Sequence, residues 1–179
     1  MYNIERFYVI LHSKILYAMI FRFSSSVFRL LFSVFALLCF FASCNHKIAY
    51  QKMDHLSNET WNMDSILFYE FTIQDSLQYY DFYIDVRNTT DYPYQNLYLF
   101  FTTQFPDNTI FTDTLNCILS DAYGRWTGKG SGKIKENRFT LKSKVRFPQT
   151  GTYIFSAQQA MTDEDLKGIA NFGITLQNE

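Results

Sequence analysis

The chain has 179 residues, with 16 Lys and Arg, 17 Asp and Glu and a net charge of −1 at neutral pH. That balance gives no electrostatic argument for binding nucleic acid, because domains that bind it are usually basic. Phe, Tyr and Trp make up 19% of the residues and there are only three cysteines, so we expect one domain held together by an aromatic core rather than by disulfides.

The most hydrophobic stretch is RLLFSVFALLCFFASC, which runs from Arg29 to Cys44. Its apolar part, Leu30 to Phe41, is shorter than the roughly 20 apolar residues that a membrane-spanning helix needs. That length is typical of the hydrophobic region of a secretory signal, and arginines precede it as a signal requires. We predict that residues 1–43 are a cleaved signal peptide, with Met19 as an alternative start.

The signal ends in Phe41-Ala42-Ser43-Cys44. This ending resembles the lipobox of bacterial lipoproteins, in which the cysteine thiol receives a diacylglyceryl group before cleavage on its amino-terminal side. The resemblance implies that Cys44 is lipidated and attaches the chain to a membrane. The alternative is an ordinary cysteine at the end of a signal anchor.

Residues 44–62, CNHKIAYQKMDHLSNETWN, are polar and show no clear periodicity. We predict that they form a tether, with Trp61 as part of the domain as an alternative, and that the folded domain spans residues 63–179.

From residue 65 onward the pattern is that of strands. In SILFYEFTI, Ser65 to Ile73, alternate residues form a uniformly apolar face. The next stretch places Tyr80, Phe82, Ile84 and Val86 on one face, which is the period-two pattern of a half-buried strand.

Further strands are expected at 97–105, 109–119, 138–147 and 152–160, and GITLQ near the end of the chain is expected to form the last. The glycine-rich residues 120–133 are expected to be a long loop or a pair of short strands. TDEDLKGI, which starts at Thr162, is expected to be a short helix, because it offers an N-cap followed by acidic residues. Seven or eight short strands predict an all-β, antiparallel β-sandwich of immunoglobulin-like or jelly-roll topology.

The predicted domain offers little for catalysis. His12 falls in the signal, and His46 and His55 fall in the tether, so no histidine is left for a metal cluster or a catalytic triad. Asp81 and Asp85 share one strand face, and we interpret that face as solvated rather than catalytic. We predict no enzyme activity, no metal and no cofactor.

One strand has a basic face, formed by alternate residues from Arg138 to Arg146. This face either meets an anionic partner or is a solvated sheet face whose lysines discourage edge pairing.

The segments VRNTTDYPYQNLYLFF, FPDNTIFTDTLNCILSDAYGRWTGKGSGK and RFPQTGTYIFSAQQAMTDEDLKGIANFGI are similar, in order and spacing, to the gliding motility lipoprotein GldH family of Bacteroidetes. The resemblance covers nearly the whole predicted domain. It implies a lipid-anchored cell-envelope protein, located at the outer membrane and facing the periplasm. Its expected partners are envelope proteins of the gliding and type IX secretion machinery, and no enzyme activity is attached to the family.

Tyr92, Tyr94 and Trp126 lie within the matching segments. These aromatic residues are candidates for a partner or ligand surface, since rings stack on sugars and peptides; packing in the core and turns is the alternative. We therefore predict a non-enzymatic lipoprotein that acts through protein contacts, with a carbohydrate- or peptidoglycan-binding lipoprotein as the alternative.

Overall fold

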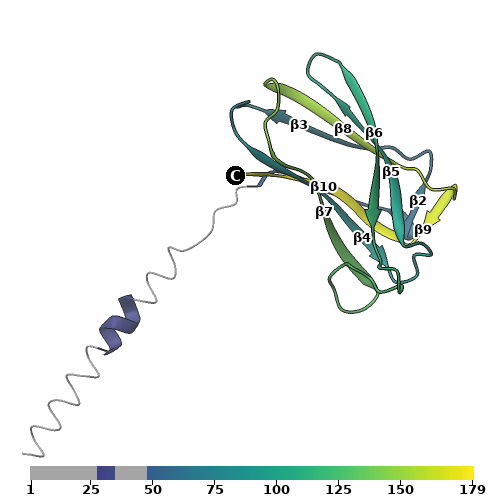
Figure 1. The fold of residues 1–179 in the computed structure, drawn as a ribbon, viewed down its shortest axis with the longest axis horizontal. Coiled ribbons are helices and arrows are strands. Elements are labelled where there is room, and N and C mark those ends of the chain that lie inside the picture. The colour runs from purple at the N-terminus through teal and green to yellow at the C-terminus, as the bar shows by residue number, and fades with distance from the viewer. Residues whose placement is uncertain (1–27, 35–47) are drawn as a thin grey trace, which may run out of the picture. The chain divides into compact units, whose positions relative to one another are not determined.

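The computed structural model describes residues 28–34 and 48–179, which are coloured in Figure 1. Residues 28–34 are helical, and the strands belong to a separate unit, His46–Glu179. No helix within the described ranges is long and apolar enough to cross a membrane. The predicted cleavage point and Cys44 lie outside these ranges.

Two four-stranded antiparallel sheets form the domain (Figure 1). The first sheet has the strand order β1 (Ile48–His55), β10 (Ile169–Asn178), β4 (Tyr80–Thr89), β7 (Ile134–Val145). The second sheet has the order β3 (Leu67–Ile73), β8 (Gly151–Gln159), β5 (Asn96–Gln104), β6 (Ile110–Ile118). A small separate sheet pairs β2 (Thr60–Asn62) with β9 (Asp165–Lys167). The prediction of an all-β sandwich is confirmed.

The order in which the chain visits the sheets distinguishes the two topologies that the sequence left open. β3 and β4 lie in different sheets, β5 and β6 are neighbours in the second sheet, and β7 and β8 again lie in different sheets. The eight principal strands form two four-stranded sheets in the orders β1-β10-β4-β7 and β3-β8-β5-β6, which is the arrangement of a jelly roll. An immunoglobulin constant-type sandwich instead divides seven strands into four and three. The structure therefore has jelly-roll topology.

Alternate residues of the central strands form the core, as their periodicity predicts. In β4 the expected apolar face is buried, with no member more than 6% exposed: Tyr80, Phe82, Ile84, Val86. β3 alternates in the same way between buried and exposed residues. The residues between them in sequence point away from the other sheet, and we call that side of each sheet its outer face.

Aromatic rings connect the two sheets across the core. The ring centroid of Phe82 in β4 lies 4.7 Å from that of Phe155 in β8, which in turn lies 5.0 Å from Phe71 in β3. Phe147, just after β7, extends this cluster to Tyr153 at 4.8 Å. Because each ring buries a large apolar area, a few side chains fill the space between the sheets.

The prediction that residues 44–62 are a tether is wrong for residues 48–62. β1 pairs with β10, and the short 3₁₀ helix η1 (Ser57–Glu59) leads from it into β2. Trp61 in β2 is fully buried, with its ring 5.0 Å from that of Phe172 and its Nε1 donating to the Ser65 carbonyl at 2.9 Å. The segment has a polar sequence because β1 is an edge strand with most of its side chains in contact with solvent.

The prediction of a short helix that starts at Thr162 is also wrong. Residues 165–167 form β9, and Leu166 is fully buried opposite Trp61. Gly168 follows at φ +91°, a conformation that glycine adopts without strain, and its N–H donates to the Glu59 carbonyl at 2.7 Å. Pairing with β2 outweighs the local helix signals, because tertiary contacts routinely override intrinsic helix propensity.

We expect Trp61→Ala to lower the free energy of unfolding by about 3–5 kcal/mol, the usual range for truncating a buried tryptophan. Urea unfolding followed by circular dichroism measures the change. Trp126→Ala is the control, because Trp126 is only half-buried and its loss is expected to cost less. Equal, small effects of the two substitutions would mean that β2 is not part of the folded domain.

Candidate functional site

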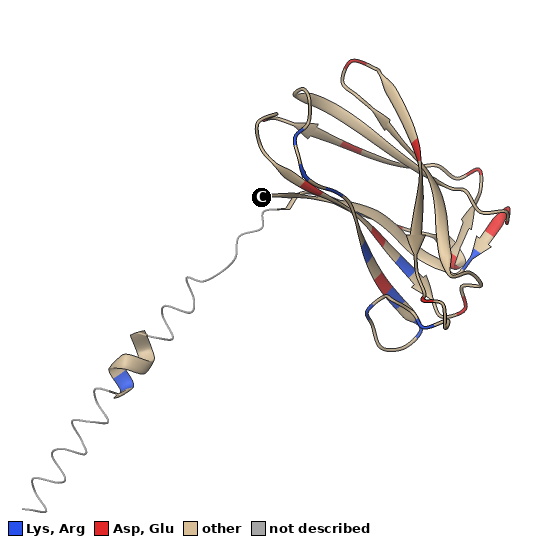
Figure 2. Ribbon diagram, in the orientation of Figure 1, with Lys and Arg blue, Asp and Glu red and all other residues tan. Residues whose placement is uncertain are grey.

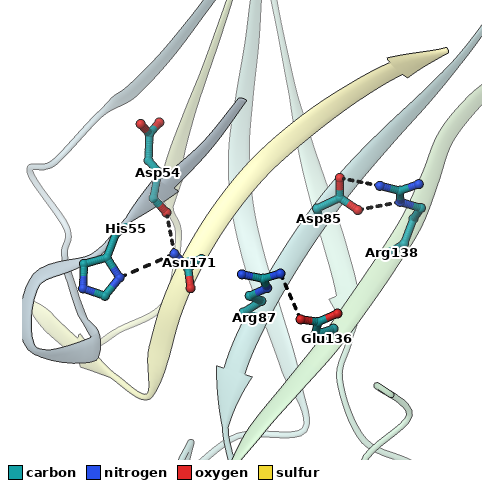
Figure 3. A network of polar contacts seen from close by, with 7 residues as sticks. All are labelled: Asp54, His55, Asp85, Arg87, Glu136, Arg138 and Asn171. Atoms are coloured by element: carbon teal, nitrogen blue, oxygen red, sulfur yellow. Dashed lines mark hydrogen bonds and ion pairs between the residues drawn. The ribbon is translucent and has the colours of Figure 1, made fainter. Parts of the chain in front are cut away.

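The outer face of the first sheet carries a network of paired polar side chains (Figure 3). Asp85 in β4 lies on this face, because its neighbours Ile84 and Val86 point into the core. In the strand register, Asp85 lies opposite Arg138 of β7 and opposite Gly173 of β10. These long-range pairings bring the network together from three strands.

The centre of the network is a bidentate ion pair. The Arg138 guanidinium donates from Nε to Asp85 Oδ1 at 2.6 Å and from Nη2 to Asp85 Oδ2 at 3.1 Å. Thr175 of β10 donates its hydroxyl to Asp85 Oδ2 at 2.6 Å. The Asp85 side chain is only 9% exposed, whereas that of Arg138 is 43% exposed. The hydrogen bond to Asp85 raises the pKa of Arg138, so the guanidinium stays charged at neutral pH.

Gly173 of β10 allows β1 to lie close to β10 beside the central ion pair. A Cβ atom at Gly173 would meet the Lys52 carbonyl oxygen and lie 2.9 Å from the Met53 Cα. Both contacts are with backbone, which cannot move aside without breaking the β1–β10 ladder. The absence of a side chain at this position is therefore required for the pairing of the two strands.

Two weaker polar pairs lie beside the central pair (Figure 3). Arg87 Nη2 lies 2.9 Å from Glu136 Oε1, and both side chains are exposed. Asn171 Nδ2 lies 3.4 Å from His55 Nδ1 on β1. Exposed pairs of this kind contribute little to stability, so the central pair is the one that shapes the face.

A hollow of about 620 Å³ lies along this network, lined in part by Gln51, Met53, Asp85, Arg87, Lys129 and Arg138. Four of its charged side chains form the pairs Asp85–Arg138 and Arg87–Glu136. Within the described residues, no three or more His, Cys, Asp and Glu side chains come together in a way that could hold a metal ion. His12 and His46 lie outside the described ranges. The arrangement is that of a surface whose central charges neutralise one another.

The structure places two of the three predicted aromatic residues together. Tyr92 and Tyr94 lie in the segment between β4 and β5, with ring centroids 5.8 Å apart in an edge-to-face arrangement. Tyr92 is only 4% exposed and its hydroxyl donates to the Asn96 carbonyl at 2.9 Å. The Tyr94 hydroxyl donates to Asp163 Oδ1 at 2.9 Å, and this bond raises the pKa of Tyr94.

Trp126 lies in another segment, between β6 and β7. It is half-buried against the core and forms a β-bridge with Ser120. In the described part of the chain, no aromatic contact joins Trp126 to Tyr92 or Tyr94. With one ring buried and one hydroxyl occupied, these residues do not offer the open stacking platform that the glycan-binding alternative requires.

The cysteine that the structure describes is unreactive. Cys117 in β6 is 3% exposed, and burial raises the pKa of its thiol to about 12. Thiol chemistry requires the thiolate, which is scarce at neutral pH with that pKa. Cys39 and the predicted lipidation residue, Cys44, lie outside the described ranges.

The outer face of the second sheet is a surface that the sequence patterns did not reveal. Figure 2 shows few charged residues on these strands. Phe68, Tyr98 and Phe100 are 56%, 41% and 48% exposed on this face, with Glu70 as its one charged side chain among the strand residues. Between the rings lie threonines hydrogen-bonded across strands, such as Thr102 with Thr112 at 2.9 Å. Exposed apolar side chains gathered on one face typically mark an interaction site.

Comparison with known proteins gives a family and two relatives. The family model described as GldH lipoprotein matches residues 48–176. A Christiangramia forsetii protein named Gliding motility lipoprotein GldH homolog is 32% identical over 163 residues, covering 87% of this chain and 97% of that protein. Gliding motility lipoprotein GldH of Flavobacterium johnsoniae is 26% identical over 144 residues, covering 76% and 89% respectively.

Solved structures give only distant likenesses. TmCBM61 in complex with β-1,4-galactotriose has a TM-score of 0.35 and 8% identity, covering 75% of this chain and 92% of that one. A carbohydrate-binding module of Cel9A from Ruminococcus flavefaciens has a TM-score of 0.34 and 10% identity, covering 72% and 98%. At these TM-scores the likenesses carry no argument about function.

We expect Arg138→Gln to lower the free energy of unfolding by about 2–4 kcal/mol, because it leaves the buried Asp85 carboxylate without its cation. Urea unfolding at neutral pH measures the loss. Arg87→Gln is the matched control, since it breaks an exposed pair on the same face and is expected to cost less than about 1 kcal/mol. If both substitutions cost the same, the central pair does not hold this face together.

Proposed function

This chain belongs to the GldH lipoprotein family, and from that membership we propose that it is a non-enzymatic lipoprotein of the cell envelope that supports gliding motility and type IX secretion-related machinery through contacts with other proteins. The observation that carries the proposal is the family match over residues 48–176, nearly the whole described domain. Two relatives named as gliding motility lipoproteins support it.

The proposed attachment is a lipid on Cys44, at the outer membrane and facing the periplasm. The apolar run after Arg29 and the small pair Ala42-Ser43 support lipidation of Cys44, and the location is the one that the family resemblance implies. β1 begins at Ile48, so three residues separate it from the lipidated cysteine. A fully extended chain of this length spans at most about 14 Å. The anchor therefore holds the jelly roll close to the membrane surface.

The proposed contact surface is the outer face of the second sheet. Phe68, Tyr98 and Phe100 expose ring surface there, and a partner that covers them removes apolar area from water at little cost in charge desolvation. The outer face of the first sheet is less suited to this role, because its central charges are already paired with each other. Aromatic residues combined with few charges are typical of the centre of a protein interface.

We expect Cys44→Ala to abolish incorporation of labelled palmitate and to move the protein from the membrane fraction to the soluble fraction of its native host. A lipid with two or more acyl chains makes anchoring stable, and its loss removes that attachment. Membrane partitioning and electrophoretic mobility that stay unchanged would contradict the anchor.

We expect Phe100→Asp to impair gliding or secretion in the native host while the protein stays folded and lipidated. The substitution places a charge at the centre of the proposed contact surface, where it has no partner. Thr140→Asp is the matched control, because Thr140 is exposed on the outer face of the first sheet. Equal effects of the two substitutions would exclude the second sheet as the contact surface.

A further inference from the structure

The sandwich is open on one side, between the edge strands β6 and β7. β6 is the last strand of the second sheet and β7 is the last strand of the first. Between them lies an apolar groove of about 290 Å³, lined among others by Phe82, Phe101, Phe111, Leu115, Leu141 and Phe147. Core rings form its floor, so the groove is a continuation of the hydrophobic core to the surface.

Phe111 shows that this side lacks a cover. In the β5–β6 register Phe111 lies opposite Thr103, and Leu115 lies opposite the buried Leu99. Alternation therefore directs Phe111 and Leu115 toward the first sheet. Phe111 is nevertheless 60% exposed. A large ring thus points inward and remains in water.

β6 is also the edge strand with the least protection against pairing. The edge of β3 is occupied by Lys52, whose Nζ donates to the Phe68 carbonyl at 2.8 Å. β7 carries lysines and takes a positive φ of 51° at Lys144, which distorts its edge. β6 is nine residues long and contains no Lys, Arg or Pro. The inward-facing Asp113 is its one charged residue, so its edge has less protection against strand addition than those of β3 and β7.

The free edge of β6 is visible in its hydrogen bonds. The N–H of Thr114 donates to the side chain of Asp113 at 2.8 Å and not to β5. The Ile118 carbonyl likewise accepts from the Thr127 hydroxyl at 3.2 Å. The main-chain groups of alternate residues of β6 therefore face away from the sheet.

Charge identifies the kind of strand that fits. Lys142 and Arg146 line the groove and are exposed, and in the described part of the chain no carboxylate forms an ion pair with either. The Arg146 guanidinium carbon lies 4.2 Å from the Tyr79 ring centroid. Asp113 is the acidic residue among those that line the groove. One side of the groove thus presents two cations that an acidic side chain can neutralise.

We propose that β6 accepts an extended segment of another envelope protein as an added strand, with alternate apolar side chains of that segment filling the groove and one acidic side chain among them pairing with Lys142 and Arg146. Main-chain bonds to β6 supply affinity and the groove supplies selectivity, as in other cases of strand addition. A lipid chain fits the observations less well, because it leaves the open main-chain groups of β6 unpaired. The inference rests on the proposed function only for the class of the partner.

The test uses the full-length protein in detergent and a labelled synthetic peptide in which Val alternates with Thr and one Asp replaces a Val. Fluorescence anisotropy measures binding, and hydrogen exchange locates it. We expect protection of β6 amides and affinity that falls by about fivefold to tenfold when the peptide Asp is replaced by Lys. Lys142→Glu should reduce or reverse that preference.

Thr114→Pro supplies a second variant, because proline is tolerated where an edge-strand N–H faces solvent but prevents pairing on that edge. It should abolish peptide binding while the circular dichroism spectrum is retained. If this variant fails to fold, the test is the comparison of the affinities of the Asp and Lys peptides for the unchanged protein and for Lys142→Glu. Equal binding of both peptides by both proteins overturns the proposal.

Two other outcomes also overturn it. Protection of β6 in the absence of peptide, together with a dimer in analytical ultracentrifugation, means that a second copy occupies the groove. Binding of phosphatidylglycerol vesicles that is lost with Lys142→Glu, without peptide binding, means that the ligand is an anionic lipid. Neither result bears on the palmitate and motility experiments, so failure of this inference is distinguishable from failure of the proposed function.

Discussion

The contact between Phe82 of the first sheet and Phe155 of the second is the interaction on which the rest of this jelly roll depends. The rings stack with centroids 4.7 Å apart, and no disulfide joins the described strands. Apolar burial must therefore supply most of the stabilisation. The same two rings also line the groove between β6 and β7. The core and the groove at the open side of the sandwich are one continuous apolar surface. The rings that stabilise the fold are therefore also rings that line the groove.

Local periodicity predicted the inner strands, because their burial is visible in alternate residues. The apolar face of β4 from Tyr80 to Val86 is the clearest case. The topology was beyond such reasoning, since hydrogen-bonded neighbours such as β1 and β10 are separated by most of the chain. β1 was mistaken for a tether because an edge strand buries few side chains. β9 was mistaken for a helix because its pairing with Trp61 is not encoded locally.

The candidate surfaces were harder to predict than the strands. Asp85 and Arg138 were placed on outer strand faces from the sequence, but their pairing depends on the β4–β7 register across 53 residues. The exposed Phe100 stands next to the buried Phe101, and two adjacent aromatic residues in a sequence do not reveal which one faces solvent. Tyr92 was proposed for a ligand surface and is instead buried, because its ring fills the turn between β4 and β5. Aromatic composition alone cannot separate these roles.

The two outer faces differ in a way that bears on how a partner finds this protein. The central charges of the first sheet are paired with each other, and the strands of the second sheet expose almost no charge on their outer face (Figure 2). Because the outer face of the second sheet presents almost no charge, electrostatic steering toward that face contributes little, and association without steering is slower. On the proposed function, the lipid on Cys44 compensates for the slow association. Confining this protein and its partner to one membrane raises their effective concentration, as a short linker does for two joined modules. An uncharged contact surface is then sufficient, because the anchor supplies the encounter and apolar burial supplies the affinity.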